Sequence, residues 1–450
     1  MSDESVENTT PAKPSGVPTK FPLTVILLLA AVYTLSYLDR QVVNIVAEHM
    51  KQDLDLADWQ IGAISGLAFA LLYATLGVPV ARIAERANRT RLISIALAIW
   101  SGCTALMGFA QNFWHLAFAR FGVGLGESGC TPPAMSLIAD TTPPKKRSKA
   151  LAIYNLGVPI GALIGMVIGG FLVDILGWRS VFFIVGPPGL LLAFVILFFV
   201  KDPRTGERAR MTAEAAAKAR ADVPSMSETA KDLATKSSFW WISLGACLTV
   251  FVGYSLQAFF ASFFLRTHLD GLTEIAASLG MPGPTTLLGL GLGIVLGLGG
   301  AIGTLLGGQI TDIWKSKKAY VYVPAVGSLI AAPLYVISFL LPSAAVAMLL
   351  LILPTIFKSL WYGPVYACIQ GICHPRSRAT AVAIFLLLLN AIGLGLGPLL
   401  VGLGSDFLSA SLGETEGLRW AMILVSAVSA LSAVCFWMAA KPLEKEFVEE

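Results

Sequence analysis

Long apolar stretches recur along this chain, and they limit its fold more than any other feature of the sequence. A helix needs about 20 mostly apolar residues to cross a bilayer. Applying that length gives twelve candidate spans, at residues 21–48, 58–82, 90–110, 113–140, 148–173, 179–200, 239–266, 285–311, 319–341, 344–371, 379–405 and 418–440. The sequence therefore predicts an all-α membrane protein with twelve transmembrane helices.

A polar, charge-rich segment separates the first six spans from the last six. The predicted divisions are a disordered cytoplasmic tail at 1–20, a six-helix bundle at 21–200, a linker at 201–238, a second six-helix bundle at 239–440 and a cytoplasmic tail at 441–450. The first tail is rich in Pro, Ser and Thr, a composition that buries little apolar surface. Within the linker, residues 211–220 are strong helix formers and predict a surface helix.

Basic residues gather on one side of the predicted membrane. Clusters of Lys and Arg follow the second, fourth, eighth and tenth spans, on the side that also holds both termini and the linker. By the positive-inside rule, this side faces the cytoplasm. We therefore expect a multi-pass protein of the cell inner (plasma) membrane with both termini cytoplasmic. Because these charges set the orientation, we expect no nucleic acid among its partners.

Composition and motifs disfavour several other classes of protein. Only 13% of the residues are charged, and 56% are hydrophobic, which argues against a large soluble core. No phosphate-binding P-loop, Gly-x-Ser-x-Gly elbow or His/Cys metal spacing appears in the sequence. The six cysteines are scattered through apolar stretches, as is typical of small buried residues. We therefore expect no cofactor, no metal site and no catalytic residue.

The two halves of the chain resemble each other. Residues 147–150 read Arg-Ser-Lys-Ala after the fourth span, and residues 376–379 read Arg-Ser-Arg-Ala after the tenth. The spans that follow are both Gly-rich, and both end near an aspartate, Asp174 or Asp406. Two pseudo-symmetric six-helix halves are typical of secondary transporters, whose substrate site lies between the halves near the membrane midplane.

A loop motif after the second span resembles the major facilitator superfamily, whose signature is Gly-x-x-x-Asp-Arg-x-Gly-Arg. Residues 81–89 read Ala-x-x-x-Glu-Arg-x-Asn-Arg, and residues 308–312 read Gly-x-x-x-Asp at the related place in the second half. In that superfamily the acidic residue is implicated in stabilising the outward-facing state. The resemblance therefore implies a conformational switch at Glu85, Arg86, Arg89 and Asp312.

Three further motifs narrow the resemblance. Residues 33–40 read Tyr-x-x-x-Tyr-Leu-Asp-Arg, residues 120–127 read Arg-x-Gly-x-Gly-x-Gly-Glu, and residues 132–140 read Pro-Pro-Ala-x-Ser-Leu-Ile-Ala-Asp. Together they are similar to the spinster branch of the superfamily and its bacterial relatives. That branch includes exporters of sphingosine-1-phosphate and proton-dependent lysophospholipid transporters. The resemblance therefore implies alternating-access transport of an amphipathic lipid or lysolipid, coupled to protons.

Charged residues at membrane depth are the strongest site candidates. By the predicted boundaries they are Asp39, Arg40, Arg120, Glu127 and Lys358. Such a charge costs about 2.5–3.5 kcal/mol at a helix centre on insertion scales, which favours a functional role. Arg120 and Glu127 are two helical turns apart and share a face, whereas the adjacent Asp39 and Arg40 point about 100° apart.

The roles of these charges have two interpretations. One is a permanent neutral network that pairs Asp39 with Arg120, or Arg40 with Glu127. We favour the other, in which Asp39 is a switching proton site with Arg40 or Arg120 as its variable partner. Burial raises the pKa of a carboxylic acid and a nearby guanidinium lowers it, so movement of the arginine would couple the proton to conformation. Glu127 would face the central cavity and bind the cationic or hydroxyl part of the substrate, and Arg120 is a further candidate for substrate binding.

Other residues are weaker candidates for the substrate chamber. Tyr33, Tyr37 and Asn390 are expected to supply polar contacts. Phe259 and Phe263 would line an apolar chamber for an acyl chain, although packing and lipid contact explain the same aromatic pattern. For Lys358, snorkelling to an interface or structural pairing is favoured over contact with an anionic head group.

Several alternative functions fit the same residues. A proton symporter of a small organic anion would use Arg40 and Arg120 as a carboxylate clamp, and a multidrug exporter is a further transporter of this kind. An integral-membrane enzyme would use Asp39 and Glu127 as acid and base, but the repeat symmetry disfavours it. A receptor is disfavoured because no soluble signalling domain is seen. The expected partners are a small-molecule or lipid substrate, protons and membrane lipids, and we expect a monomer.

Overall fold

The computed structural model describes residues 21–203, 226–374 and 377–448, and within these ranges it is helical and contains no strand. The N-terminal half consists of α1 (Leu23–Leu54), α2 (Asp58–Gly62), α3 (Ala68–Arg86), α4 (Arg89–Met107), α5 (Phe113–Ser128), α6 (Thr131–Thr141), α7 (Arg147–Asn155), α8 (Gly157–Leu176) and α9 (Trp178–Phe199). A 3-10 turn, η2 (Pro144–Lys146), precedes α7.

The C-terminal half follows the short helix α11 (Met226–Thr235). It consists of α12 (Ser237–Thr267), α13 (Leu269–Ser278), α14 (Pro284–Ile294), α15 (Gly300–Trp314), α16 (Ala319–Leu340), α17 (Ala344–Leu350), α18 (Ile352–Ser359), α19 (Tyr362–Gly371), α20 (Arg378–Leu388), α21 (Gly397–Leu412) and α22 (Glu414–Glu446). Three π-helical turns join α2 to α3, α14 to α15 and α20 to α21: η1 (Ala63–Leu67), η3 (Val295–Gly299) and η5 (Leu389–Leu396).

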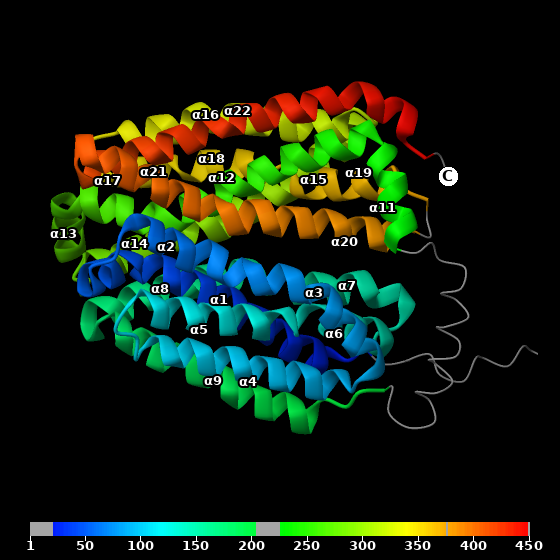
Figure 1. Ribbon diagram of the computed structural model, residues 1–450, viewed down its shortest axis with the longest axis horizontal. Helices are drawn as coiled ribbons and strands as arrows, with labels where there is room; N and C mark the ends of the chain where they lie inside the picture. Colours follow the sequence, from blue (N-terminus) through cyan, green and yellow to red (C-terminus); the bar gives the residue numbers. More distant parts are fainter. Residues whose placement is uncertain (1–20, 204–225, 375–376, 449–450) are drawn as a thin grey trace, which may run out of the picture.

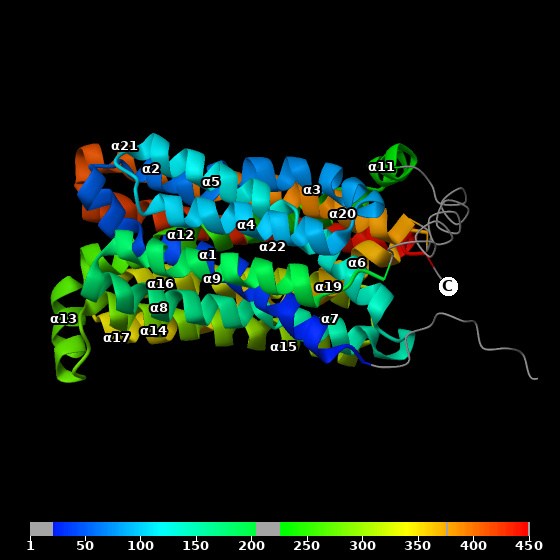
Figure 2. The same ribbon diagram turned by 90° about the horizontal axis from the view of Figure 1, so that it is seen from below.

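The helices run along the long axis of the molecule, and the two halves lie side by side (Figure 1). Contacts of α1 with α12, α2 with α21 and α8 with α14 join the halves. Helix α1 begins and α22 ends at one end of the molecule, which we call the tail end. Helices α13 and α17 lie at the opposite end, which we call the α13 end, and both views agree on this arrangement (Figures 1 and 2).

Eleven helical segments among the described residues are long and apolar enough to cross a membrane. Several of them combine two or three of the helices named above, as α7 and α8 do. The remaining predicted span, 113–140, is divided into α5 and α6. Its two prolines fall at the start of α6, where a missing backbone donor costs least. With the α5–α6 pair as the twelfth crossing, the prediction of a twelve-helix all-α membrane protein is confirmed.

Glycines of α8 hold this helix against α1. Gly157, Gly161, Gly165 and Gly169 recur every fourth residue and lie on the face that meets α1. A side chain at Gly161 would fall on the carbonyl oxygen of Thr34. Such small-residue stripes allow close helix packing in membranes, where van der Waals contact drives helix association. This packing fixes the position of α1, which carries several of the site candidates.

Two boundaries differ from those expected. Helix α22 continues to Glu446 rather than ending at 440, because Leu443 is buried and Phe447 stacks on Tyr320 at 5.9 Å between ring centroids. The surface helix expected at 211–220 lies outside the described residues. Within the linker, the described helix is α11.

We predict that Gly161→Ala lowers the unfolding temperature of the detergent-solubilised protein. Overpacking at a tight contact typically costs about 1–3 kcal/mol, and here the added carbon meets backbone rather than a flexible side chain. Gly102→Ala in α4 is the matched control, because a Cβ at Gly102 meets nothing within 4 Å. Equal unfolding temperatures for the two variants, measured by intrinsic fluorescence, would contradict the prediction.

Candidate functional site

Asp39 of α1 pairs with Arg120 of α5 inside the N-terminal half. The Arg120 Nη1 to Asp39 Oδ2 distance is 2.8 Å, and the two side chains are 1% and 2% exposed. Thr104 of α4 donates a hydrogen bond to Asp39 Oδ1 at 2.6 Å, and Arg120 Nε donates to the carbonyl oxygen of Ile64 at 3.3 Å. Each charged group therefore has both a counter-ion and a further hydrogen bond.

Arg40 of α1 pairs with Glu127, also on α5. Its Nη2 and Nε donate to Glu127 Oε2 at 2.6 and 3.1 Å, and Ser36 donates to the same oxygen at 2.7 Å. The guanidinium lies over the ring of Phe69, at 4.4 Å from its centroid, and over that of Tyr73 at 5.0 Å. The second carboxylate oxygen, Glu127 Oε1, is buried and has no hydrogen-bond partner among the described residues.

The two pairs form one compact, neutral group, which we call the α1–α5 network. Arg120 also lies over Phe69, at 5.1 Å, so one ring contacts both guanidinium groups. Gly126 lets α5 pack closely against α4, because a side chain there would meet Ala96 and Trp100 of α4 at 2.7 Å. In this conformation Asp39 pairs with Arg120 rather than Arg40, and both pairings of the neutral-network interpretation are present.

The tyrosine candidates lie beside this network. Tyr33 stacks on Tyr154 at 4.6 Å between centroids and meets Tyr37 edge-on at 5.3 Å. From the other half, Tyr254 of α12 packs against the same apolar cluster as Tyr33 and Tyr73. The contact between the halves thus lies beside the network.

A side-chain amide pair extends that contact. Gln257 of α12 donates to Gln41 of α1 at 2.8 Å. Asn390 lies in η5, which packs against α3 and η1 of the opposite half. The residues at this interface therefore come from both halves.

Phe259 and Phe263 do not line an open chamber in this conformation. Both side chains are fully buried, and Phe263 packs edge-on against Phe339 at 5.1 Å between centroids. In this conformation the packing alternative describes both residues. Their place in an acyl-chain chamber stays a prediction.

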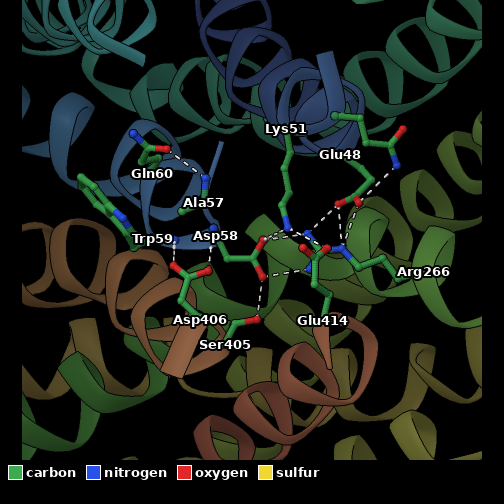
Figure 3. Close-up of polar contacts among 11 residues, drawn as sticks. Glu48, Lys51, Ala57, Asp58, Trp59, Gln60, Arg266, Ser405, Asp406 and Glu414 are labelled. Carbon is green, nitrogen blue, oxygen red and sulfur yellow. Dashed lines mark hydrogen bonds and ion pairs between the residues drawn. The ribbon is translucent and has the colours of Figure 1, made fainter. Parts of the chain in front are cut away.

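Charged residues close the α13 end across the two halves (Figure 3). Arg266 of α12 pairs with Glu48 of α1 at 2.8 Å and with Asp58 of α2 at 2.7 Å. Lys51 lies 3.2 Å from Asp58, and Ser405 of α21 donates to Asp58 at 2.6 Å. We call these five residues the α13-end cluster. Sequence reasoning missed it, because Glu48 and Arg266 stand at the ends of predicted spans, where burial is not expected.

The repeat-related aspartates bind helix starts in the opposite half. Asp406 of α21 accepts the backbone N–H groups of Asp58 and Trp59 at 3.0 and 2.8 Å, at the start of α2 (Figure 3). Asp174 of α8 accepts the backbone N–H of Thr286 at 2.6 Å, at the start of α14. A carboxylate is favourable at a helix N-terminus, where N–H groups are free and the dipole is positive. Each half therefore closes on the other through the same contact.

Comparison with known proteins identifies the family. A family model described as Major Facilitator Superfamily matches residues 29–398. The chain belongs to the major facilitator superfamily. It is 32% identical to an MFS-type efflux pump of Mycolicibacterium smegmatis, over 94% of each protein. It is 27% identical to protein spinster homolog 1 of Rattus norvegicus, over 94% of this chain and 81% of that protein.

A solved structure narrows the relationship within the superfamily. The inward-facing, unoccupied crystal structure of a bacterial homologue of the human lysosomal transporter spinster has a TM-score of 0.82 and 31% identity. The match covers 95% of this chain and 98% of that one. This protein is therefore a spinster-like, multi-pass transporter of the major facilitator superfamily.

The superfamily's loop motif anchors the tail end of the N-terminal half. Arg89 is fully buried and binds Asp202 after α9, at 2.5 Å, and Asp140 of α6, at 2.7 Å. The side chains of Glu85 and Arg86 lie outside those that the structure describes, and that of Asp312 on α15 is exposed. Asp202, in the predicted linker, is a further partner that the motif did not reveal.

We predict that Arg266→Gln promotes opening of the α13 end. It leaves the Glu48 and Asp58 carboxylates without their shared guanidinium, and breaking a buried ion pair costs about 3–5 kcal/mol. Spin labels at Gln52 and Ser411, which are exposed on opposite halves at this end, should report a larger population at long distance. The matched control is Arg179→Gln, which removes an exposed pair with Asp53 within one half. Identical distance distributions in the two variants would refute a closing role for Arg266.

Proposed function

We propose that this transporter moves an amphipathic lipid or lysolipid by alternating access, coupled to protons. The observation that carries the proposal is the α1–α5 network, in which two carboxylates and two guanidinium groups are buried together beside the contact with α12. Purely structural contacts between helices rarely need four buried charges, because each is expensive at membrane depth. The relationship to spinster proteins supports the same function.

Asp39 is the proton site in this proposal. Protonation of Asp39 would remove the counter-ion of Arg120 and leave a buried guanidinium without a carboxylate. Because an unpaired buried cation is strongly unfavourable, Arg120 would move toward Glu127 or into the space between the halves. Arg120 shares the ring of Phe69 with Arg40, so its movement would disturb the second pair as well.

Glu127 binds the polar head of the substrate. Its Oε1 atom lacks a hydrogen-bond partner among the described residues, so it can accept one from a hydroxyl or ammonium group. Tyr33, Tyr37 and Tyr254 supply nearby phenol groups. A head group that binds there would compete with Arg40 for Glu127 and so alter the same network that carries the proton.

The conformation described above corresponds to an inward-facing state. Closure of the α13 end by the Arg266 pairs and the two aspartates supports this assignment, as does the similarity to an inward-facing relative. The positive-inside rule places the tail end, and both termini, in the cytoplasm. The inner (plasma) membrane is the proposed location.

We predict that Asp39→Asn abolishes accumulation driven by a pH gradient. The amide cannot release a proton, so the gradient no longer acts on the network, whereas exchange of substrate at equal pH persists. The assay uses proteoliposomes with labelled 1-oleoyl lysophosphatidate, and albumin extracts the probe from the outer leaflet. Asp53→Asn is the matched control, because Asp53 lies at the α13 end in an exposed pair. Gradient-driven transport by Asp39→Asn at the wild-type rate would overturn the proton assignment.

We predict that Glu127→Gln weakens substrate binding by about 10–100-fold, the loss expected for a charge-assisted hydrogen bond. Because this change also leaves Arg40 without a counter-ion, the double variant Arg40→Gln/Glu127→Gln restores charge balance. If Glu127 contacts the substrate, the double variant binds as weakly as the single one. Recovery of binding in the double variant would instead assign Glu127 a structural role. Affinity is measured by thermal stabilisation with lysophosphatidate.

Export of amphipathic drugs is the second candidate function. The relative from Mycolicibacterium smegmatis that is described as an efflux pump favours it, and Glu127 would then bind a cationic drug. The same proteoliposomes loaded with ethidium distinguish the two functions. Glu127-dependent movement of ethidium without movement of lysophosphatidate would favour drug export.

A further inference from the structure

Lys358 lies midway along the membrane-spanning segment Ala344–Gly371, in α18. Its Nζ packs against Gly253 of α12, so that a Cβ at residue 253 would lie 2.6 Å from it. No hydrogen bond or ion pair within the described part of the chain involves this amine. At this depth the side chain packs inside the protein rather than at a membrane interface, and it has no structural partner among the described residues, unlike the two favoured expectations from the sequence.

The pseudo-symmetry of the halves relates Lys358 to Glu127. Glu127 precedes Ser128, the last residue of α5, and Lys358 precedes Ser359, the last residue of α18. In each half two non-helical residues follow before the next helix, α6 or α19, begins. Equivalent positions in the two halves thus carry a carboxylate and an amine.

The surroundings of Lys358 place it beside the contact between the halves. Gly253 is one helical turn from Gln257 and shares its face of α12. Gln257 donates a hydrogen bond to Gln41 of α1, next to Arg40 in the sequence. The side chain of Lys358 is partly exposed, and its Nζ is not among the fully buried, unbonded polar atoms of the described residues.

We propose that Lys358 binds the anionic head of the transported molecule, a phosphate or carboxylate, while Glu127 accepts a hydrogen bond from a hydroxyl or ammonium group of the same head. This inference rests on the proposed transport function and assigns a separate role to the C-terminal half. A lysine ammonium offers three donors and a compact charge, which suits an anionic oxygen. A ligand anion would also supply the counter-ion that Lys358 lacks among the described residues.

The test compares two amphiphiles that differ by one phosphate, 1-oleoyl lysophosphatidate and 1-oleoylglycerol. Affinity is measured by thermal stabilisation of the full chain in nanodiscs. Lys358→Met should bind lysophosphatidate about tenfold more weakly, as for loss of a charge-assisted hydrogen bond, and bind oleoylglycerol as the wild type does. Lys358→Arg should retain most of the preference for the phosphate. The control is Lys318→Met, at an exposed lysine that pairs with Glu444 near the tail end.

The outcomes separate this inference from the proposed function. Equal affinity of the wild type and Lys358→Met for lysophosphatidate overturns the role of Lys358, while albumin-detected transport of either lipid still supports lipid transport. If the wild type transports neither lipid, lipid transport itself fails. Gluconate, a small anion without an acyl chain, is the third probe. Stabilisation by gluconate that depends on Lys358 supports the anion site in a transporter of small organic anions. Failure of both lysophosphatidate and gluconate to stabilise the wild type overturns the anion site.

Discussion

Four buried charges between α1 and α5 set requirements that the rest of the N-terminal half meets. A buried ion pair is tolerated when its geometry is good and its remaining polar groups are bonded. Ser36, Thr104 and the carbonyl of Ile64 supply those bonds, and the Phe69 ring lies against both guanidinium groups. The glycines of α8 in turn hold α1 in place. Packing and electrostatics therefore support the same arrangement. Of the four carboxylate oxygens in the network, Glu127 Oε1 is the one without a hydrogen-bond partner among the described residues.

Helix α1 joins the parts of the protein that alternating access must coordinate. Asp39 and Arg40 are consecutive residues, so the two pairs with α5 share one stretch of backbone. Gln41 contacts α12, and Glu48, two turns further on, binds Arg266 in the α13-end cluster. A shift of α1 that changes either pair must also move its contacts with the other half. Helix α1 carries residues of both the α1–α5 network and the α13-end cluster. Because each set of contacts influences the position of this one helix, the helix is a physical basis for coupling between them.

The sequence was sufficient to predict the twelve crossings, the repeat and the buried charges, because apolar length and intramembrane charge are local properties. It could not decide how Asp39, Arg40, Arg120 and Glu127 pair, since two acids and two bases allow both partitions. The aromatic run of α12 was also ambiguous, because Phe263 shows the same spacing whether it packs in a core or lines a chamber. The α13-end cluster joins residues more than 200 positions apart in the chain. Only tertiary structure brings such residues together.

The two halves share their closing contacts but differ at their centre. Asp174 and Asp406 bind helix starts in the opposite half in the same way, so closure draws equally on both halves. Glu127 and Lys358 occupy equivalent positions with opposite charge. Contacts that form and break together in one motion benefit from symmetry. Contacts with a substrate must instead match the chemical groups of that substrate. An amphiphile whose head carries an anion and a hydrogen-bond donor has no two-fold axis, and a symmetric scaffold can recognise it only where its repeats have diverged.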